Sequence, residues 1–147
     1  MLEFEPFLVP LTGNENFIYE ECSMPFSVLE FWQWSASNLL SNATRGVLAE
    51  FLVAKALGVD ASKCREEWAS FDLETSCGVK VEVKSASYLQ GWEQKQLSPI
   101  IYVVKPTRAL DSKTGKRSNL TERSADVYVF AMLAHKDRAS VNPLNLD

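Results

Sequence analysis

The sequence contains few residues that bind transition metals and no apolar run of membrane-spanning length. It has a single histidine, His135, and three cysteines, Cys22, Cys64 and Cys77, which form neither an even disulfide set nor a closely spaced ligand pair. These counts exclude most zinc sites and favour reduced thiols. The acidic amino terminus has no basic region ahead of an apolar one, which is unlike a secretory signal. We therefore expect a cytoplasmic protein that does not interact with a membrane.

Basic residues are absent from the first 44 positions, which carry six glutamates and a net charge of −6. We do not expect a polyanion to bind to this segment. The stretch from Phe26 to Leu40 is rich in aromatic residues and predicts a helix that follows a turn at Met24-Pro25. Its aromatic side chains either pack as a core or a dimer face, or stack on nucleic-acid bases. We favour the packing role.

Length and composition indicate one domain. A chain of 147 residues that is 46% hydrophobic can build one sizeable core but not two. We divide residues 1–147 into an acidic and aromatic N-terminal segment (1–41), a core (42–133) and a tail (134–147). The tail ends on residues typical of the start of another element, so we expect either a truncated chain or a minimal one.

The most informative stretch, Phe71 to Gln90, reads FDLETSCGVKVEVKSASYLQ and predicts a β-hairpin. Side chains alternate between the two faces of a strand, so its valines share one face and its charged residues the other. The valines are Val79, Val81 and Val83, and the charged residues are Lys80, Glu82 and Lys84. One face is therefore suited to a core and the other to charged chemistry.

The register of this hairpin decides whether a second carboxylate reaches the charged face. Ser76-Cys77-Gly78 predicts a three-residue loop whose last position favours a left-handed glycine. With Thr75 opposite Val79, Asp72 lies opposite Glu82 and on the same face. A two-residue loop would shift the pairing by one residue and turn Asp72 to the other face.

A helix before the hairpin strengthens this interpretation, because charged residues on the wet face of a strand are common and a weak signal alone. We expect the helix over Asn42–Leu57, with Ser41 or Asn42 as its cap and Gly58 as its stop. Apolar or bare residues lie three and four positions from Glu50, so its carboxylate is costly to bury without a metal ion, a cation or hydrogen-bond donors. The alternative is a glutamate that reaches water at the edge of the apolar stripe.

Taken together, these residues resemble the PD-(D/E)XK nuclease superfamily, which has the restriction-endonuclease-like fold. The resemblance covers roughly residues 42–133: Arg45-Gly46-x-x-Ala49-Glu50 in the helix, Asp72 in a strand, Glu82-x-Lys84 in the next strand and Gln90 after it. It departs from the pattern at Phe71, where the motif has proline. It implies an α/β fold with an αβββαβ core and a mixed central sheet, here with an additional N-terminal helical segment.

The resemblance also implies a role for each motif residue. Asp72 and Glu82 become ligands of a divalent metal ion, Mg²⁺ or Mn²⁺, with Glu50 as a further ligand. Lys84 becomes the cation beside the attacking water. Glu50 and Gln90 become auxiliary catalytic residues, although Gln90 taken alone is equally typical of a surface amide.

A basic segment from Lys105 to Arg123 contrasts with the acidic amino terminus. Its basic residues outnumber its acidic ones by six to two, a net charge of +4, and its composition predicts an exposed, mobile loop. It is either a solvated linker or a nucleic-acid-binding arm, since affinity for nucleic acid follows the local field. Apolar runs predict a buried strand at Ile100–Val104 and a central strand at Asp126–Leu133. The candidate nucleic-acid-binding residues are Lys105, Arg108, Lys113, Lys116, Arg117 and Arg123.

These observations favour a metal-dependent nuclease that hydrolyses phosphodiester bonds, with DNA as the expected substrate and partner. The chain has little room for a separate recognition domain, which favours recognition of DNA structure, a homodimer or a partner subunit. Two alternatives remain open at this point. One is a catalytically inactive nucleic-acid-binding module of the same fold, and the other is a protein-interaction module.

Overall fold

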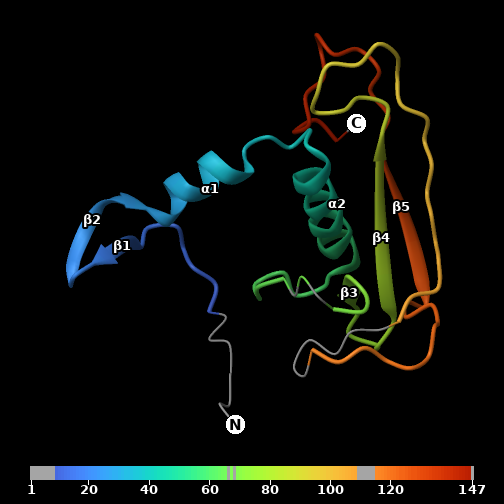
Figure 1. The fold of residues 1–147 in the computed structure, drawn as a ribbon, viewed down its shortest axis with the longest axis horizontal. Coiled ribbons are helices and arrows are strands. Elements are labelled where there is room, and N and C mark those ends of the chain that lie inside the picture. The colour runs from blue at the N-terminus through green and yellow to red at the C-terminus, as the bar shows by residue number, and fades with distance from the viewer. Residues whose placement is uncertain (1–8, 66, 68, 109–114, 147) are drawn as a thin grey trace.

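The structure is a computed structural model that describes residues 9–65, 67, 69–108 and 115–146. Figure 1 shows an arm at the N-terminal side and a body made of a helix and a sheet. The elements in chain order are β1 (Asn16–Tyr19), β2 (Cys22–Ser27), α1 (Val28–Ala36), α2 (Asn42–Leu57), β3 (Leu73–Glu74), β4 (Lys80–Ser87) and β5 (Val127–Leu133). The described part of the chain is thus a mixed α/β structure, as the sequence predicts. No helix within it is both long and apolar enough to cross a membrane.

The N-terminal arm consists of β1, β2 and α1. Strands β1 and β2 pair antiparallel around Glu20-Glu21, whose φ angles are 46° and 65°. Helix α1 starts after Ser27, which forms a capping box with Glu30. The predicted N-terminal helical segment is therefore present. The turn predicted at Met24-Pro25 is wrong, because Pro25 lies inside β2, where a two-stranded ribbon tolerates a residue without an N–H donor.

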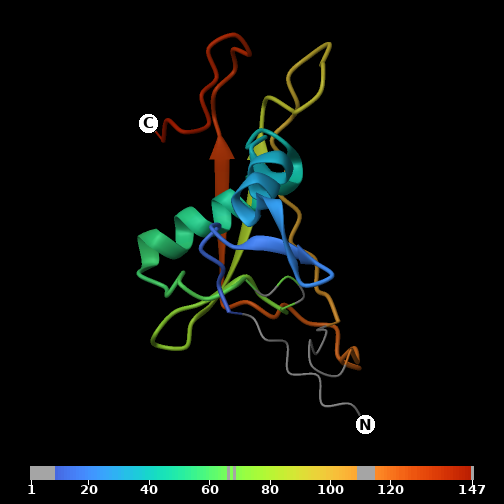
Figure 2. The same cartoon turned by 90° about the vertical axis from the view of Figure 1, so that its left-hand side faces the viewer.

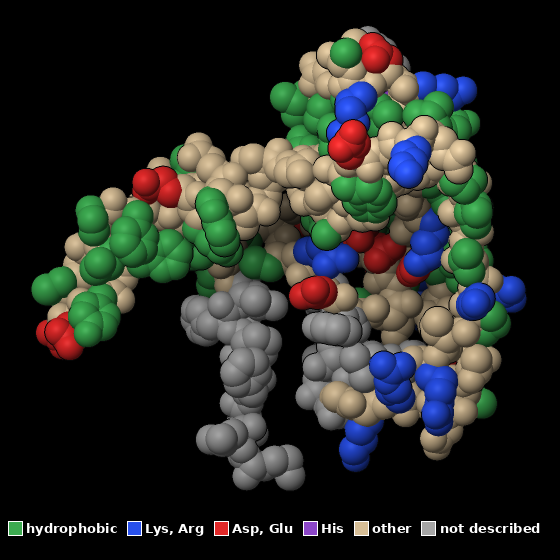
Figure 3. Space-filling view, turned by 45° about the horizontal axis from the view of Figure 1, so that its top comes forward, with side chains coloured by type: hydrophobic (Ala, Val, Ile, Leu, Met, Phe, Trp, Pro, Cys, Tyr) green, Lys and Arg blue, Asp and Glu red, His purple; other side chains and the backbone are tan. Residues whose placement is uncertain are grey.

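The arm extends away from the body in Figure 1, and in Figure 2, which looks along it, the arm lies in front of the body. Many of its apolar side chains are exposed, as Figure 3 shows. Trp34 is 85% exposed, and Val28 is the buried residue of α1. Core packing of the aromatic segment is therefore wrong for most of α1. The reason is that the body leaves this helix without a partner face in the described structure. The dimer-face and base-stacking interpretations stay predictions.

Helix α2 has the predicted bounds and caps. The Ser41 hydroxyl accepts a hydrogen bond from the Thr44 backbone N–H at 3.3 Å. Gly58 ends the helix in the left-handed conformation with φ of 66°, and its N–H donates to carbonyls of the last turn. These local signals fix where the helix begins and ends.

The hairpin also has the predicted register. Leu73 pairs with Val81 and Glu74 with Lys80, so β3 is antiparallel to β4. In the loop, the Thr75 N–H donates to the Val79 carbonyl at 3.0 Å, and the glycine at position 78 has φ of 81°. A three-residue loop therefore connects the strands, as the sequence predicts.

The core lies between α2 and one face of the sheet. Ala49 of α2 packs against Val81 and Val83 of β4, which are only 2% and 7% exposed. Val129 and Ala131 of β5 pack at the edge of this cluster. The valine face of β4 is thus the core face, which leaves the alternate charged residues directed to the other side.

The sheet is smaller than expected. Its strand order is β3-β4-β5, with β4 parallel to β5, so the sheet is mixed as predicted. However, β4 is the central strand and β5 an edge strand. The central position predicted for Asp126–Leu133 is therefore wrong.

The edge position of β5 follows from the segment Ile100–Val104, which the sequence predicts to be a buried strand. Ile100–Val104 lies along β5 without forming a strand (Figure 1). Tyr102 anchors it, since its Oη donates to the Ala131 carbonyl at 2.9 Å and its ring lies 4.7 Å from the Phe130 ring. Side-chain contacts thus replace a backbone ladder. Within the described residues, the third strand and second helix of an αβββαβ core are absent.

Candidate functional site

Asp72, Glu82 and Lys84 come together where β3 meets β4. The Asp72 Oδ2 accepts a hydrogen bond from the Val83 backbone N–H at 2.6 Å, and Lys84 Nζ contacts Glu82 Oε1. The charges of Glu82 and Lys84 both act on the Asp72 carboxyl. Figure 3 shows a recess near the middle of the molecule in which acidic and basic side chains gather. The hairpin register therefore brings two carboxylates and a lysine side by side.

Asp72 is the most perturbed carboxyl of this group. Burial raises its pKa from 3.8 to about 6, because removal from water penalises the charged form. The hydrogen bond from Val83 lowers the pKa, the negative charges of Glu50 and Glu82 raise it, and Lys84 lowers it. Carboxyls that repel one another in a partly buried setting are typical of functional sites.

Glu50 of α2 faces the same region, and its partner is a cation. Its side chain is 13% exposed and makes a two-point contact with Arg65, whose Nε contacts Oε2 and whose NH2 group donates to Oε1 at 3.0 Å. The pKa of Arg65 is raised, first by its hydrogen bond to Glu50. Nothing in the sequence marks Arg65 out within its polar connector, so sequence analysis missed it. Arg65 supplies the compensation that a carboxylate on an apolar helix face needs.

Loss of this partner is expected to destabilise the fold. Replacing Arg65 with alanine should lower the free energy of unfolding by about 1–2 kcal/mol, because a largely buried Glu50 carboxylate is left uncompensated and the arginine side is partly screened by solvent. Urea denaturation of both proteins measures the difference. Arg117→Ala, which removes an exposed arginine, is the matched control. Equal unfolding free energies for all three proteins would contradict a stabilising role for the pair.

Gln90 lies beyond the far end of β4. It is 8% exposed, its Nε2 donates to the Ser87 carbonyl at 3.1 Å, and its Oε1 is buried with no partner among the described residues. The strand rises roughly 3.3 Å per residue, which puts Ser87 about 17 Å from Glu82. The structure thus gathers Asp72, Glu82, Lys84 and Glu50 but not Gln90. Its auxiliary role stays a prediction, and its buried position is unlike a surface amide.

Two other side chains organise the loop that holds Gln90. Gln94 accepts from the Gln90 N–H at 2.7 Å and donates to the Ser98 hydroxyl at 3.0 Å. Arg138 of the tail donates to the Gln90 carbonyl at 2.8 Å and contacts the Trp92 carbonyl. These polar contacts tie the glutamine-rich loop to the tail, a structural role that accounts for its composition.

The basic segment Lys105–Arg123 leaves the body beside the acidic residues. Its two ends pair through Thr107 and Glu122, with hydrogen bonds of 2.9 and 3.0 Å in the two directions. Arg108 Nε donates to the Ser118 carbonyl at 2.8 Å. Five candidate nucleic-acid-binding residues are exposed, as predicted: Lys105, Arg108, Lys116, Arg117 and Arg123. The sixth, Lys113, lies outside the described residues.

A small pocket connects this segment with the site. It has a volume of about 160 Å³ and is lined by Glu82, Lys84 and Tyr128 from the sheet. Lys105, the first residue of the basic segment, and Ser124, which follows its last residue, also line it. Sequence analysis missed Tyr128 and Ser124. The strand pattern indicates that Tyr128 lies in a strand, but only the parallel pairing of β4 with β5 places it next to Glu82.

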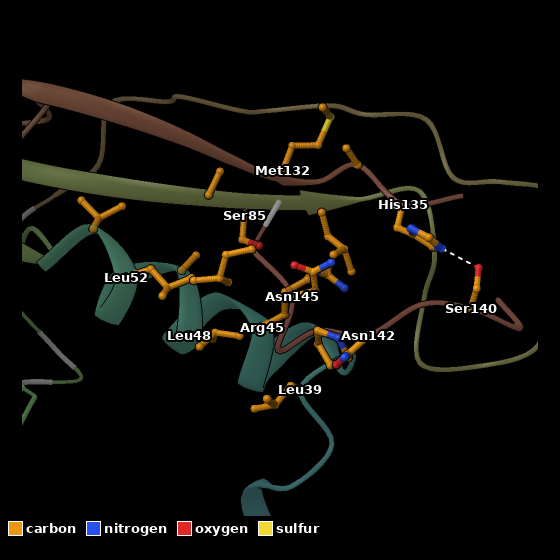
Figure 4. Close-up of a pocket in the computed structure, with 17 residues that line it drawn as sticks. Leu39, Arg45, Leu48, Leu52, Ser85, Met132, His135, Ser140, Asn142 and Asn145 are labelled. Carbon is orange, nitrogen blue, oxygen red and sulfur yellow. Dashed lines mark hydrogen bonds between the residues drawn. The ribbon is translucent and has the colours of Figure 1, made fainter. Parts of the chain in front are cut away.

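A larger groove opens on the other face of the sheet. It has a volume of about 790 Å³ and lies between α2, the end of β5 and the tail (Figure 4). Leu48 and Leu52 of α2 line one side, and Met132 lines the opposite side. At its far end, His135 Nε2 and Ser140 Oγ form a hydrogen bond of 2.9 Å. The lining of the groove is mostly apolar, and none of the described residues that form it is acidic.

The donor set at the site fits a hard divalent cation. Asp72 and Glu82 offer carboxylate oxygens, and Mg²⁺ is commonly held by one or two carboxylates while it keeps several waters. Burial first, and then the negative charges of Glu50 and Glu82, raise the pKa of Asp72, and a bound cation would favour its charged form. No set of three or more acidic, cysteine or histidine residues within the described chain is arranged to hold a metal. The fit therefore rests on two ligands, with Glu50 already held by Arg65.

The described chain thus has a mixed α/β fold whose site holds two carboxylates with an adjacent lysine. A sequence model of the bacteriophage T4 endonuclease IV family matches residues 27–147, which include the whole site. The chain therefore belongs to the bacteriophage T4 endonuclease IV family, which identifies it as a nuclease. The comparison with curated proteins found no match, and neither did the comparison with solved structures.

Proposed function

We propose that this protein is a divalent-metal-dependent nuclease that hydrolyses phosphodiester bonds in DNA with a PD-(D/E)XK-type site. The observation that carries the proposal is the Asp72 carboxyl, whose pKa is raised by burial and by Glu50 and Glu82, with Lys84 beside it. Membership of an endonuclease family supports it. The exposed basic segment next to the same residues supports a polyanionic substrate.

Each residue of the site has a distinct task in this proposal. Asp72 and Glu82 would hold Mg²⁺ or Mn²⁺, which supplies Lewis-acid activation of a phosphodiester and of water when bound. Lys84 places a fixed positive charge beside the reacting phosphate, where negative charge increases in the transition state. Glu50 is held in position by Arg65 and orients the acidic cluster as an auxiliary group. Gln90 shapes the loop that follows β4.

A direct cleavage assay tests the proposal. Linear, circular and branched DNA are incubated with the purified protein and Mg²⁺ or Mn²⁺, and parallel reactions contain EDTA. Cleavage should require the metal ion and should be lost in Glu82→Gln, which keeps the size of the side chain but removes its charge. Intact DNA under every condition, together with no heat of Mn²⁺ binding, would contradict the proposal and support an inactive module of the same fold.

The basic segment should make most of the contacts to DNA phosphates. Replacing Lys113, Lys116 and Arg117 together with alanine is expected to weaken DNA binding by roughly a power of ten at low salt and to reduce the salt dependence of the affinity, because fewer counterions are released. Fluorescence anisotropy over a salt series measures both quantities. Stability should barely change, since exposed charges contribute little to folding.

The matched control removes the same number of charges elsewhere. Lys55, Lys63 and Lys95 are exposed and lie outside the basic segment. Their triple alanine variant should bind DNA with nearly the parental salt slope. If both triple variants lose the same affinity, net charge alone explains the effect, and the basic segment has no special role.

A further inference from the structure

The 160 Å³ pocket between β4, β5 and the ends of the basic segment contains more hydrogen-bond donors than the fold needs. Within the described chain, Lys105 makes no ion pair, and the Tyr128 hydroxyl has no hydrogen-bond partner. The Ser124 Oγ is buried and also lacks a partner there. Buried polar groups are normally paired, so an unpaired donor at the wall of a pocket indicates a missing partner. The pocket therefore suits a ligand that accepts several hydrogen bonds.

The charge and size of the pocket indicate the chemistry of this ligand. Lys84 and Lys105 bring two positive charges against the single negative charge of Glu82. Its volume corresponds to about five water molecules at roughly 30 Å³ each, which is room for the oxygens of one phosphate group. A serine hydroxyl rotates between staggered positions, so Ser124 can turn its donor toward the pocket. Ammonium groups and hydroxyls are the donors that proteins use to hold phosphate oxygens.

The pairing of β4 with β5 fixes where such a phosphate would lie. Glu82 is the direct partner of Tyr128, and neighbouring strands are about 4.8 Å apart. A nucleic-acid strand with one phosphate at Asp72 and Glu82 would have its neighbouring phosphate within reach of the pocket, because Glu82 also lines it. The net charge of the pocket is only weakly positive, which favours a phosphate that is already delivered by the rest of the strand over a free anion.

We propose that this pocket binds the backbone phosphate next to the scissile phosphodiester, and that Lys105, Ser124 and Tyr128 are its ligands. The inference rests on the proposed nuclease function and adds a binding subsite to it. Tyr128 and Lys105 are binding residues that position the strand. They should act through affinity for one particular phosphate and not through the reaction itself.

A scan with neutral linkages tests the subsite. A set of short DNA oligonucleotides each carries one uncharged methylphosphonate at a different position around the mapped cut. Affinity is measured in EDTA by fluorescence anisotropy, and kcat/KM is measured with Mg²⁺. For the parent, one position beside the cut should weaken binding about tenfold. In the double variant Lys105→Gln/Tyr128→Phe, a methylphosphonate at that same position should not weaken DNA binding any further. At the other positions, the methylphosphonate should weaken binding as much as it does for the parent.

The controls and outcomes separate the subsite from the nuclease activity. Tyr19→Phe removes an exposed phenol hydroxyl from β1 of the N-terminal arm and should keep the parental pattern in the EDTA scan. The subsite proposal is wrong if each methylphosphonate weakens binding of the double variant as much as binding of the parent. It is also wrong if no methylphosphonate weakens binding of the parent. Either conclusion would hold even if the protein cuts DNA. If the position-specific effect appears without any cleavage, the phosphate subsite stands and the nuclease proposal fails. A parent that neither binds nor cuts DNA overturns both.

Discussion

Replacing Lys84 with alanine is expected to abolish DNA cleavage while divalent-metal binding persists. The Lys84 Nζ contacts Glu82 and offers its charge beside the carboxylates, so it can stabilise a developing negative charge but cannot be a metal ligand. The loss in kcat should be at least on the order of 10²–10³, the range seen when one electrostatic stabiliser is removed. Single-turnover cleavage assays with Mg²⁺ measure the rate, and calorimetry with Mn²⁺ measures the affinity.

Lys95→Ala provides the comparison for this experiment. Lys95 is an exposed lysine in the loop beyond the far end of β4, and its removal changes the net charge by the same amount. It should cut DNA at nearly the parental rate. If Lys84→Ala loses metal affinity with an intact fold, its assigned role is wrong, because the lysine would then serve to organise the metal ligands.

The second large effect is expected for Asp72→Asn. This variant should neither bind Mn²⁺ nor cleave DNA. Its free energy of unfolding at neutral pH should nevertheless be higher than that of the parent. The folded-state pKa of Asp72 is raised from 3.8 to about 6, so the folded protein holds a proton that the unfolded chain has released. Protonated Asp72 therefore stabilises the folded protein relative to the charged form. This stabilisation is complete below about pH 4 and is lost as the pH rises through 6. Asparagine resembles the protonated form at every pH.

The stability difference between these two proteins should therefore depend on pH. At pH 7.5 the variant should be more stable than the parent by about 1 kcal/mol, a value reduced from the full linkage energy because the half-buried carboxyl is partly screened by solvent. At pH 4 the two should be nearly equal. Urea denaturation at both values measures this. In the parent, Mn²⁺ affinity should also fall toward low pH, by up to tenfold per unit below pH 6, because the proton competes with the metal. A pH-independent stability difference would contradict the raised pKa.

The hairpin shows how much local sequence determines in this protein. Ser76-Cys77-Gly78 selects a three-residue loop, and that loop fixes which residues of β3 and β4 are opposite one another. The same local logic places α2 between Ser41 and Gly58. In both cases the decisive interactions join residues that are close in the chain, so caps and turn residues are sufficient to predict them.

The parts that sequence analysis missed depend on contacts between distant residues. Arg65 pairs with Glu50 across 15 positions, and Tyr102 holds Ile100–Val104 beside β5 through a side-chain contact with Ala131. An apolar run predicts burial, but whether its backbone joins a sheet depends on the neighbour that it meets. Likewise, the aromatic residues of α1 predict a packed helix, although the described body offers no face to receive it.

The sequence by itself thus determined the helix that carries Glu50, the hairpin register and the convergence of Asp72, Glu82 and Lys84, because each follows from periodicity, caps and a turn. Only the tertiary structure decided which cation compensates Glu50, that β5 lies at the edge of the sheet, and that Tyr128 and Ser124 meet Lys105 beside Glu82. These features come from the parallel pairing of β4 with β5, which are separated by 39 residues between Ser87 and Val127. No local propensity specifies the register of strands so far apart, because it is fixed by the side-chain packing of the completed core.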